Sequence, residues 1–210
     1  MTEYLTAEQV RVRLDVSRET LGRLKIYVEL LLKWQRAINL IGPGTVADVW
    51  GRHVLDCGQL MQYIPRDKAP VVDIGSGAGL PGLILAIMGV RDVKLVESNS
   101  RKCTFLREAA RATKTSVEIV ESRVEHIQNM AAGVITARAL APLTILTELS
   151  QSVTKPNSTY LFLKGKNLRN ELTHLKKNWK MKLEVLPSLT NLDGSILKME
   201  SVTRVNAAHD

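Results

Sequence analysis

The stretch Val71-Val72-Asp73-Ile74-Gly75-Ser76-Gly77-Ala78-Gly79-Leu80-Pro81-Gly82 decides the fold, because a short apolar run leads straight into a cluster of glycines. Such a run predicts a buried strand, a tight turn and a helix, with backbone amide groups that a ligand can approach closely. Pro81 suits the first turn of the helix, where a missing N–H is harmless. A plain turn does not need this many glycines, so the loop predicts a site for a nucleotide-like ligand.

Two registers of this loop predict different ligands. Read from Gly77, it spells Gly-x-Gly-x-x-Gly, which is typical of dinucleotide-binding enzymes. Read from Gly75, it spells Gly-x-Gly-x-Gly with Asp73 two positions earlier. Glu97 ends the next expected strand about twenty residues on, where a carboxylate can accept hydrogen bonds from ribose hydroxyls. Asp73 favours S-adenosylmethionine over NAD, because a carboxylate beside the loop suits a ligand that carries an ammonium group.

Short apolar runs alternate with helical segments after Pro70, which predicts a mostly parallel sheet with helices on both faces. The expected strands are 71–74, 93–97, 117–121, 134–137, 160–164, 182–186 and 196–205. The expected helices between them are 81–88, 100–112, 142–152 and 168–179. A short connection around Asp193-Gly194 predicts that the last two strands form a hairpin. The expected fold class is therefore α/β, with a doubly wound, mostly parallel seven-stranded sheet.

The first third of the chain has a different, helical pattern. Apolar residues recur at helical spacing over residues 20–38, and the turn Ile41-Gly42-Pro43-Gly44 ends that helix. A second helix is expected over residues 46–63, stopped by Pro65. We therefore expect residues 1–65 to form a helical extension packed on a main domain of residues 66–210.

Composition excludes several classes of protein. The chain has 210 residues, of which 45% are hydrophobic, enough for the core of one ordinary domain. Cys57, Cys103 and the scattered histidines offer neither a disulfide framework nor metal-ligand spacing, so no metal is expected. The sequence shows no signal peptide and no apolar run long enough to cross a membrane. We expect a soluble, cytoplasmic monomer.

The formal net charge of +8 is unevenly distributed. One segment concentrates basic residues that only Glu171 opposes: Lys164, Lys166, Arg169, Lys176, Lys177, Lys180 and Lys182. Such a run can be a solvated helix face, or it can bind a polyanion, most plausibly a nucleic acid. The sequence alone leaves both interpretations open.

Several motifs in order resemble one family, the bacterial 16S ribosomal RNA guanine-N7 methyltransferases, also called glucose-inhibited division protein B. The stretch from Asp73 to Gly82 is similar to the first motif of class I methyltransferases. The other matching motifs are Arg52-His53-Val54-Leu55-Asp56, Glu121-Ser122-Arg123-Val124-Glu125, Ala137-Arg138-Ala139 and Leu163-Lys164-Gly165. The resemblance covers about residues 39–166 and implies a class I methyltransferase (Rossmann-like) fold with S-adenosylmethionine as cofactor.

The resemblance also implies roles for individual residues. Glu97 would hold the ribose, Val124 and Glu125 would flank the adenine, and Arg138 would lie where cofactor and substrate meet. The implied cofactor-binding residues are Asp73, Gly75, Gly77, Gly79, Leu80, Glu97, Val124, Glu125 and Arg138. The implied catalytic residues are Arg138 and Arg123, and the implied RNA-binding residues are His53, Lys164 and Lys166. The chain departs from the family pattern after Gly194, where a basic residue is expected sooner than Lys198.

The residues 52–56 have a simpler interpretation that does not need the resemblance. His53 would then be a packing histidine, and Asp56 would pair with Arg52 one turn earlier on a helix. With the resemblance, both would help to form the wall of the site.

The expected chemistry needs little from the protein beyond positioning. Guanine N7 carries a lone pair and no proton, so transfer of a methyl group to it requires no general base. The sequence offers no Ser-His-Asp arrangement and no pair of carboxylates that would supply one. In A-form RNA the N7 edge faces a deep groove that side chains cannot enter, so a looped or extruded guanine is expected. The partner would be 16S ribosomal RNA or the small ribosomal subunit.

Three other functions are weighed against this one. An NAD-dependent oxidoreductase would need the register from Gly77 and a group that handles hydride chemistry. A non-catalytic RNA-binding protein would retain the fold without the reaction. A small-molecule S-adenosylmethionine-dependent methyltransferase is the nearest alternative, and the basic run between Lys164 and Lys182 disfavours it.

Overall fold

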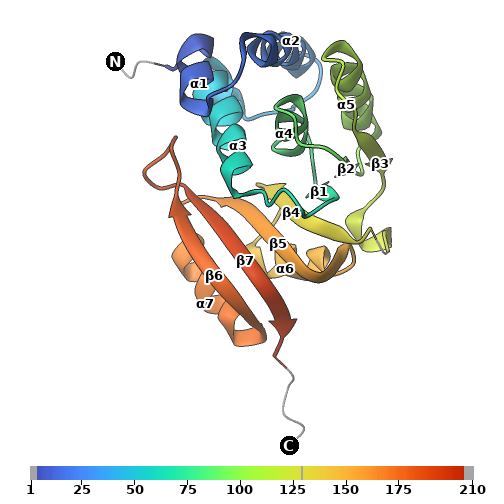
Figure 1. The fold of residues 1–210 in the computed structure, drawn as a ribbon, viewed down its shortest axis with the longest axis vertical. Coiled ribbons are helices and arrows are strands. Elements are labelled where there is room, and N and C mark those ends of the chain that lie inside the picture. The colour runs from blue at the N-terminus through green and yellow to red at the C-terminus, as the bar shows by residue number, and fades with distance from the viewer. Residues whose placement is uncertain (1–3, 129, 206–210) are drawn as a thin grey trace, which may run out of the picture.

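A seven-stranded sheet forms the centre of the computed structural model, which describes residues 4–128 and 130–205 (Figure 1). Its strands are β1 (Val71–Ile74), β2 (Val93–Glu97), β3 (Glu118–Glu121), β4 (Ala132–Arg138), β5 (Thr154–Lys164), β6 (Trp179–Pro187) and β7 (Ser195–Arg204). They lie in the order β3-β2-β1-β4-β5-β7-β6. Strands β1 to β5 pair in parallel, whereas β7 runs antiparallel to β5 and β6. The predicted doubly wound sheet with a terminal hairpin is confirmed.

Helices cover both faces of this sheet. They are α1 (Ala7–Leu14), α2 (Arg18–Gln35), α3 (Asp56–Gly58), α4 (Gly82–Ile87), α5 (Ser100–Ala112), α6 (Leu143–Ser150) and α7 (Leu168–Asn178). Successive residues of a strand point to opposite faces, so Val71 packs in the core under α2, α4 and α5, and Val72 in the core under α6 and α7. The sheet is thus buried on both sides, as its apolar strands predict.

The N-terminal helices share a core with the methyltransferase-like part of the chain. Leu24 and Leu31 of α2 belong to the same buried cluster as Leu83 and Phe105. The buried hydroxyl of Tyr27 donates a hydrogen bond of 2.7 Å to the carbonyl of Ala78 in the glycine loop. The extension therefore supports the loop directly, while a domain boundary at residue 65 stays a prediction.

The N-terminal part differs from the expectation in its local structure. Helix α1 was not expected, and a capping box between Thr6 and Gln9 starts it. The single helix expected over residues 46–63 is broken into a 3-10 turn (Pro43–Asp48), a π turn (Trp50–Leu55), α3 and a second 3-10 turn (Gln59–Tyr63). A π turn within a helix is frequent at functional sites.

Strand β5 begins at Thr154 rather than at the expected Tyr160. Pro156 and Asn157 lie in a bulge of this strand. Asn157 adopts a φ of 65°, and the pairing of β4 with β5 shifts register between Ala132 and Val134.

Within the described ranges, no helix is long and apolar enough to cross a membrane.

Candidate functional site

The glycine loop joins β1 to α4 through residues with positive φ. Gly75 has a φ of 66° and Gly79 a φ of 83°, conformations that disfavour a side chain. A Cβ atom on Gly75 would lie 2.5 Å from Cδ1 of Leu140, and one on Gly79 would lie 2.6 Å from Cβ of Leu83. The loop is therefore packed between α4 and the segment after β4, and these glycines cannot be replaced without displacing a neighbour.

Asp73 lies fully buried beneath this loop. One carboxylate oxygen accepts a hydrogen bond of 3.2 Å from the amide of Gly82, and the other accepts one of 2.8 Å from the hydroxyl of Thr136. Burial raises the pKa of Asp73 to about 6, although these hydrogen bonds oppose the shift. Its carboxylate thus ties β1 to β4 and α4, and the expected contact with an ammonium group stays a prediction.

Glu97 occupies the carboxyl end of β2, and its residue is 8% exposed. Its Oε2 atom accepts a hydrogen bond of 2.9 Å from the amide of Gly77, and its Oε1 atom accepts one of 2.8 Å from the amide of Asn99. A carboxylate oxygen can accept more than one hydrogen bond, so Glu97 can also receive ribose hydroxyls while it holds the loop.

A cleft of about 290 Å³ opens at the carboxyl ends of β1 to β4. Its lining includes Gly75 and Glu97 as well as Arg123, Val124 and Glu125. Val124 is buried, whereas Arg123 and Glu125 are exposed. The cleft lies where the strand order reverses between β1 and β4, which is where such sheets bind ligands. We refer to it below as the nucleoside cleft, because its carboxylate and apolar wall fit a ribose and a flat base.

Not every residue expected at the cofactor lines this cleft. Gly75, Glu97, Val124 and Glu125 do so, together with Arg123. Gly77 supports the cleft through its hydrogen bond to Glu97. The structure places Gly79 and Leu80 behind them, packed toward α4 and the core.

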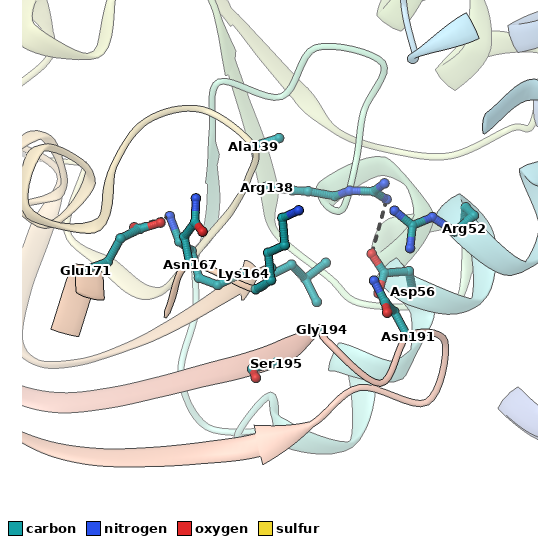
Figure 2. Close-up of a pocket in the computed structure, with 13 residues that line it drawn as sticks. Arg52, Asp56, Arg138, Ala139, Lys164, Asn167, Glu171, Asn191, Gly194 and Ser195 are labelled. Atoms are coloured by element: carbon teal, nitrogen blue, oxygen red, sulfur yellow. Dashed lines mark ion pairs between the residues drawn. The ribbon is translucent and has the colours of Figure 1, made fainter. Parts of the chain in front are cut away.

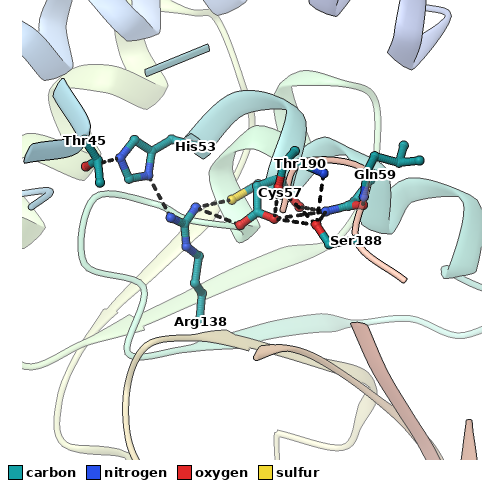
Figure 3. A network of polar contacts seen from close by, with 9 residues as sticks. Thr45, His53, Cys57, Gln59, Arg138, Ser188 and Thr190 are labelled. Carbon is teal, nitrogen blue, oxygen red and sulfur yellow. Dashed lines mark hydrogen bonds and ion pairs between the residues drawn. The ribbon is translucent and has the colours of Figure 1, made fainter. Parts of the chain in front are cut away.

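Arg138, at the end of β4, is held by three partners from the segment 53–57 (Figure 3). Its guanidinium lies 2.9 Å from Nδ1 of His53, 3.4 Å from Sγ of Cys57 and 3.4 Å from Oδ2 of Asp56. Burial lowers the pKa of Arg138, but Cys57 and Asp56 more than offset this and raise it. The side chain is 17% exposed, so its positive charge remains accessible at the site.

His53 is buried behind Arg138, with an exposed fraction of 4%. Burial lowers its pKa to about 3, with Arg138 and Arg52 acting in the same direction, so the ring is neutral. A guanidinium can only donate, so Nδ1 of His53 accepts from Arg138 and the proton lies on Nε2. Nε2 then donates to the hydroxyl of Thr45 at 2.7 Å. Both ring nitrogens are engaged inside the protein, in contrast to the expected contact between His53 and RNA.

Asp56 joins Arg138 (Figure 2) to the connection between β6 and β7. Its Oδ1 atom accepts hydrogen bonds from Thr190 at 2.9 Å, from Gln59 at 3.0 Å and from Ser188 at 3.3 Å. The amide of Gln59 in turn binds this connection at Ser188. The simpler interpretation, in which Asp56 pairs with Arg52, is wrong, because the carboxylate turns to Arg138 and to the segment 188–190, which is remote in sequence.

A second pocket, of about 350 Å³, is lined by Arg138 (Figure 2). We call it the substrate pocket. Figure 2 shows Arg52, Asp56 and Arg138 at one end and Asn167 and Glu171 at the other. The substrate pocket and the nucleoside cleft share Ala139, which follows Arg138 directly. A group bound in one can therefore face a group bound in the other at this residue.

The two lysines expected to bind RNA have different surroundings. The ammonium of Lys164 lies 2.6 Å from a carboxylate oxygen of Glu171 and 3.2 Å from the carbonyl of Ala141. Glu171 also accepts a hydrogen bond of 2.7 Å from the amide of Leu143. Lys164 thus helps to hold the segment after Arg138, whereas Lys166 is exposed at the rim of the substrate pocket.

Sequence reasoning missed several residues of this site. Arg52, half-buried in the wall of the substrate pocket, was treated only as a partner for Asp56. Its position in the motif 52–56 could have indicated a role in the site. Cys57, Gln59 and Thr190 carried no comparable signal, because their contacts join segments that are far apart in the sequence.

Comparison with known proteins adds an independent line of support. Residues 20–197 match the family model GidB, described as rRNA small subunit methyltransferase G. The chain is 48% identical over 200 residues to ribosomal RNA small subunit methyltransferase G of Paramagnetospirillum magneticum, covering 95% of this chain and 98% of the relative. It is 42% identical to the protein of the same name from Rhodospirillum centenum, covering 93% and 91% of the two chains.

Solved structures share the fold at low sequence identity. A SAM-dependent methyltransferase from Aquifex aeolicus has a TM-score of 0.54 and 13% identity, covering 70% of this chain and 89% of that one. The structure of TYW2 from M. jannaschii in complex with AdoMet has a TM-score of 0.56 and 14% identity, covering 81% and 80%. These likenesses confirm the class I methyltransferase architecture.

Proposed function

The chain belongs to the GidB family of small subunit ribosomal RNA methyltransferases, and on this premise we propose that it methylates N7 of a guanine in 16S ribosomal RNA. S-adenosylmethionine would be the methyl donor. The observation that carries the proposal is the meeting of the nucleoside cleft and the cation-lined substrate pocket at Ala139.

The nucleoside cleft fits S-adenosylmethionine by the chemistry of its walls. Gly75 offers backbone at a point where a Cβ would collide with Leu140, and Glu97 offers acceptors for the ribose. Val124 and Glu125 would flank the adenine. When bound, S-adenosylmethionine supplies an electrophilic methyl group on a positively charged sulfur. The residues Gly75, Gly77 and Glu97 would fix its position through backbone and carboxylate contacts.

The surroundings of Arg138 suit a substrate atom that carries no proton. His53 is neutral, but its only acceptor nitrogen is occupied by Arg138, so it is not placed to remove a proton from a substrate. A methyl transfer to guanine N7 needs no such step. Arg138 itself can donate to guanine O6 and leave N7 free. His53 and Asp56 hold that guanidinium in place. Catalysis would rest mainly on holding N7 in line with the methyl group, an effect that can supply roughly 7–11 kcal/mol.

The remaining predicted residues divide by location. Arg123 lies on the exposed edge of the nucleoside cleft, so its proposed role is contact with RNA beside the cofactor rather than inside the substrate pocket. Lys166 and Arg52 would bind phosphate oxygens at the substrate pocket. Lys164 would position the segment after Arg138. We further propose a cytoplasmic monomer acting on 16S ribosomal RNA or the small subunit.

The alternative functions receive less support. A small-molecule methyltransferase is not favoured, because the relatives at 42–48% identity carry ribosomal RNA methyltransferase names. An NAD-dependent oxidoreductase is not favoured either, because residues 20–197 match a family model of rRNA small subunit methyltransferases.

The experiment uses small ribosomal subunits from a strain that lacks the gene. The subunits are incubated with the protein and S-adenosylmethionine with a labelled methyl group, and the digested nucleosides are identified by mass. Labelled 7-methylguanosine is expected, and the Arg138→Ala variant should lose it. Label on another nucleoside would contradict the guanine-N7 assignment, and no label from a protein that binds S-adenosylhomocysteine would contradict the proposed substrate.

A further inference from the structure

The substrate pocket continues into a groove along α7, which we call the α7 groove. It has a volume of about 550 Å³. Its lining residues are Gly165, Lys166, Leu168, Arg169, Leu172, Thr173, Lys176, Val185, Asp193 and Ser195. Gly165, Lys166 and Ser195 also line the substrate pocket. The substrate pocket and the α7 groove therefore adjoin at these three residues.

Within the part of the chain that the structure describes, the exposed cations of this groove form no ion pair. Lys166, Arg169 and Lys176 are exposed, and none of the ion pairs found in residues 4–128 and 130–205 involves them. Asp193 is the one acid in the described lining. Other lysines nearby do have partners: Lys182 pairs with Glu200, and Lys198 pairs with Glu184. The α7 groove thus keeps its positive charge available for an anion.

The groove also offers apolar surface between these charges. Val185 of β6 is 49% exposed, and half-buried Leu172 and buried Leu168 also line the groove. Alternating phosphates and flat bases need such a combination of cations and apolar contact. A duplex has no unstacked bases to place against this surface, whereas a single strand does.

We propose that the α7 groove binds the single-stranded RNA segment that flanks the target guanine, with Arg169 and Lys176 contacting its phosphates. The proposal rests on the proposed function, since the target guanine occupies the substrate pocket. It divides the basic run between Lys164 and Lys182 into residues that line the groove and residues that do not. Lys177 and Lys180 are equally exposed but lie outside the lining, and they make no contact with this segment.

Two double variants of the full chain with the same change in charge test this division. One is Arg169→Glu with Lys176→Glu, in the groove, and the other is Lys177→Glu with Lys180→Glu, outside it. Binding to a fluorescent single-stranded RNA oligonucleotide is measured by anisotropy over a range of salt concentrations. The groove variant should weaken binding by about tenfold at low salt and reduce the slope of log K against log salt by roughly 1–2. The control variant should change the affinity by about twofold or less.

A second readout separates this inference from the proposed function. With small subunits as substrate, the groove variant should raise KM while kcat and the affinity for S-adenosylhomocysteine stay unchanged. Equal losses of RNA binding in the two variants would show an effect of net charge alone and would overturn the groove. If wild-type protein produced no 7-methylguanosine, the proposed function would fail, while the oligonucleotide comparison would still decide whether the groove binds RNA.

Discussion

The nucleoside cleft and the substrate pocket meet at Ala139, yet they are built from different kinds of contact. At the glycine loop, the nucleoside cleft depends on backbone conformation: the φ of 66° at Gly75 and the amide of Gly77, which donates to the Glu97 carboxylate over a separation of 20 residues. Side chains form the wall of the substrate pocket. There Arg138 binds His53 over a separation of 85 residues, and Thr190 binds Asp56 over a separation of 134.

This difference assigns different tasks to the two regions. A backbone cradle changes little with the identity of nearby side chains, so it suits a cofactor that many enzymes share. A buried polar network holds one arrangement only if each member keeps its partners. The side-chain network around Arg138 therefore has the properties needed to fix one substrate orientation, and it is the region where single substitutions should act selectively.

The largest expected effect comes from Arg138→Ala, which should lower kcat/KM for small subunits by about 10²–10³-fold. Loss of one positioned donor at a reacting group typically costs this much, about 2.7–4 kcal/mol. The affinity for S-adenosylhomocysteine, measured by calorimetry, should change by less than about threefold, because the guanidinium faces residues 53–57 and the substrate pocket.

Arg138→Lys is the matched control, since it keeps the charge but loses the forked geometry that binds His53 and Asp56 together. It should remain impaired by about tenfold or more. A large loss of cofactor affinity in Arg138→Ala would place this residue in the nucleoside cleft and break the comparison.

The same difference explains how much could be predicted from the sequence. The alternation of strands and helices and the positions of Gly75 and Glu97 follow from local patterns, because spacing within one strand-helix-strand unit fixes them. The Arg138–Asp56–Thr190 contacts do not follow, because no local pattern specifies which remote loop meets a helix. The broken helix over residues 46–63 was missed for a related reason: tertiary packing overrides helical spacing there.

Asp73 supports both regions, because its carboxylate binds Gly82 after the glycine loop and Thr136 of β4. Its folded pKa of about 6 lies above the ordinary value of 3.8, so the folded chain binds the proton more tightly between these values. The free energy of unfolding should therefore fall as the pH rises through this window, and the difference amounts to about 3 kcal/mol above pH 6. In Asp73→Asn this fall in the free energy of unfolding with rising pH should vanish. The measurement is urea unfolding at pH values from about 4 to 7.

Asp67→Asn, at an exposed aspartate, is the control for this measurement. It should follow the wild-type pH dependence closely. An Asp73→Asn variant that does the same would mean that the buried carboxylate does not titrate in this range.

Gly75→Ala tests the nucleoside cleft, because it disturbs the backbone of the glycine loop and leaves the side-chain network around Arg138 intact. A positive φ costs a residue with a Cβ about 1–2 kcal/mol, and the new atom would also displace Leu140. We expect the affinity for S-adenosylhomocysteine to fall by roughly 30-fold, which corresponds to about 2 kcal/mol. Gly22→Ala is the control, since its Cβ meets nothing within 4 Å and the helix should gain about 0.5–1 kcal/mol in stability.

The smallest effect is expected for Thr190→Val, which removes one hydroxyl donor from Asp56 and keeps the shape of the side chain. Such a hydrogen bond contributes about 1 kcal/mol, so KM for small subunits should rise roughly fivefold while kcat stays unchanged. Asp56 retains Gln59, Ser188 and Arg138, which is why the loss stays small. Thr104→Val, on the exposed face of α5, is the matched control and should alter neither constant. If Thr190→Val instead weakened S-adenosylhomocysteine binding, the network around Arg138 would extend into the nucleoside cleft, and the two regions would act as one unit.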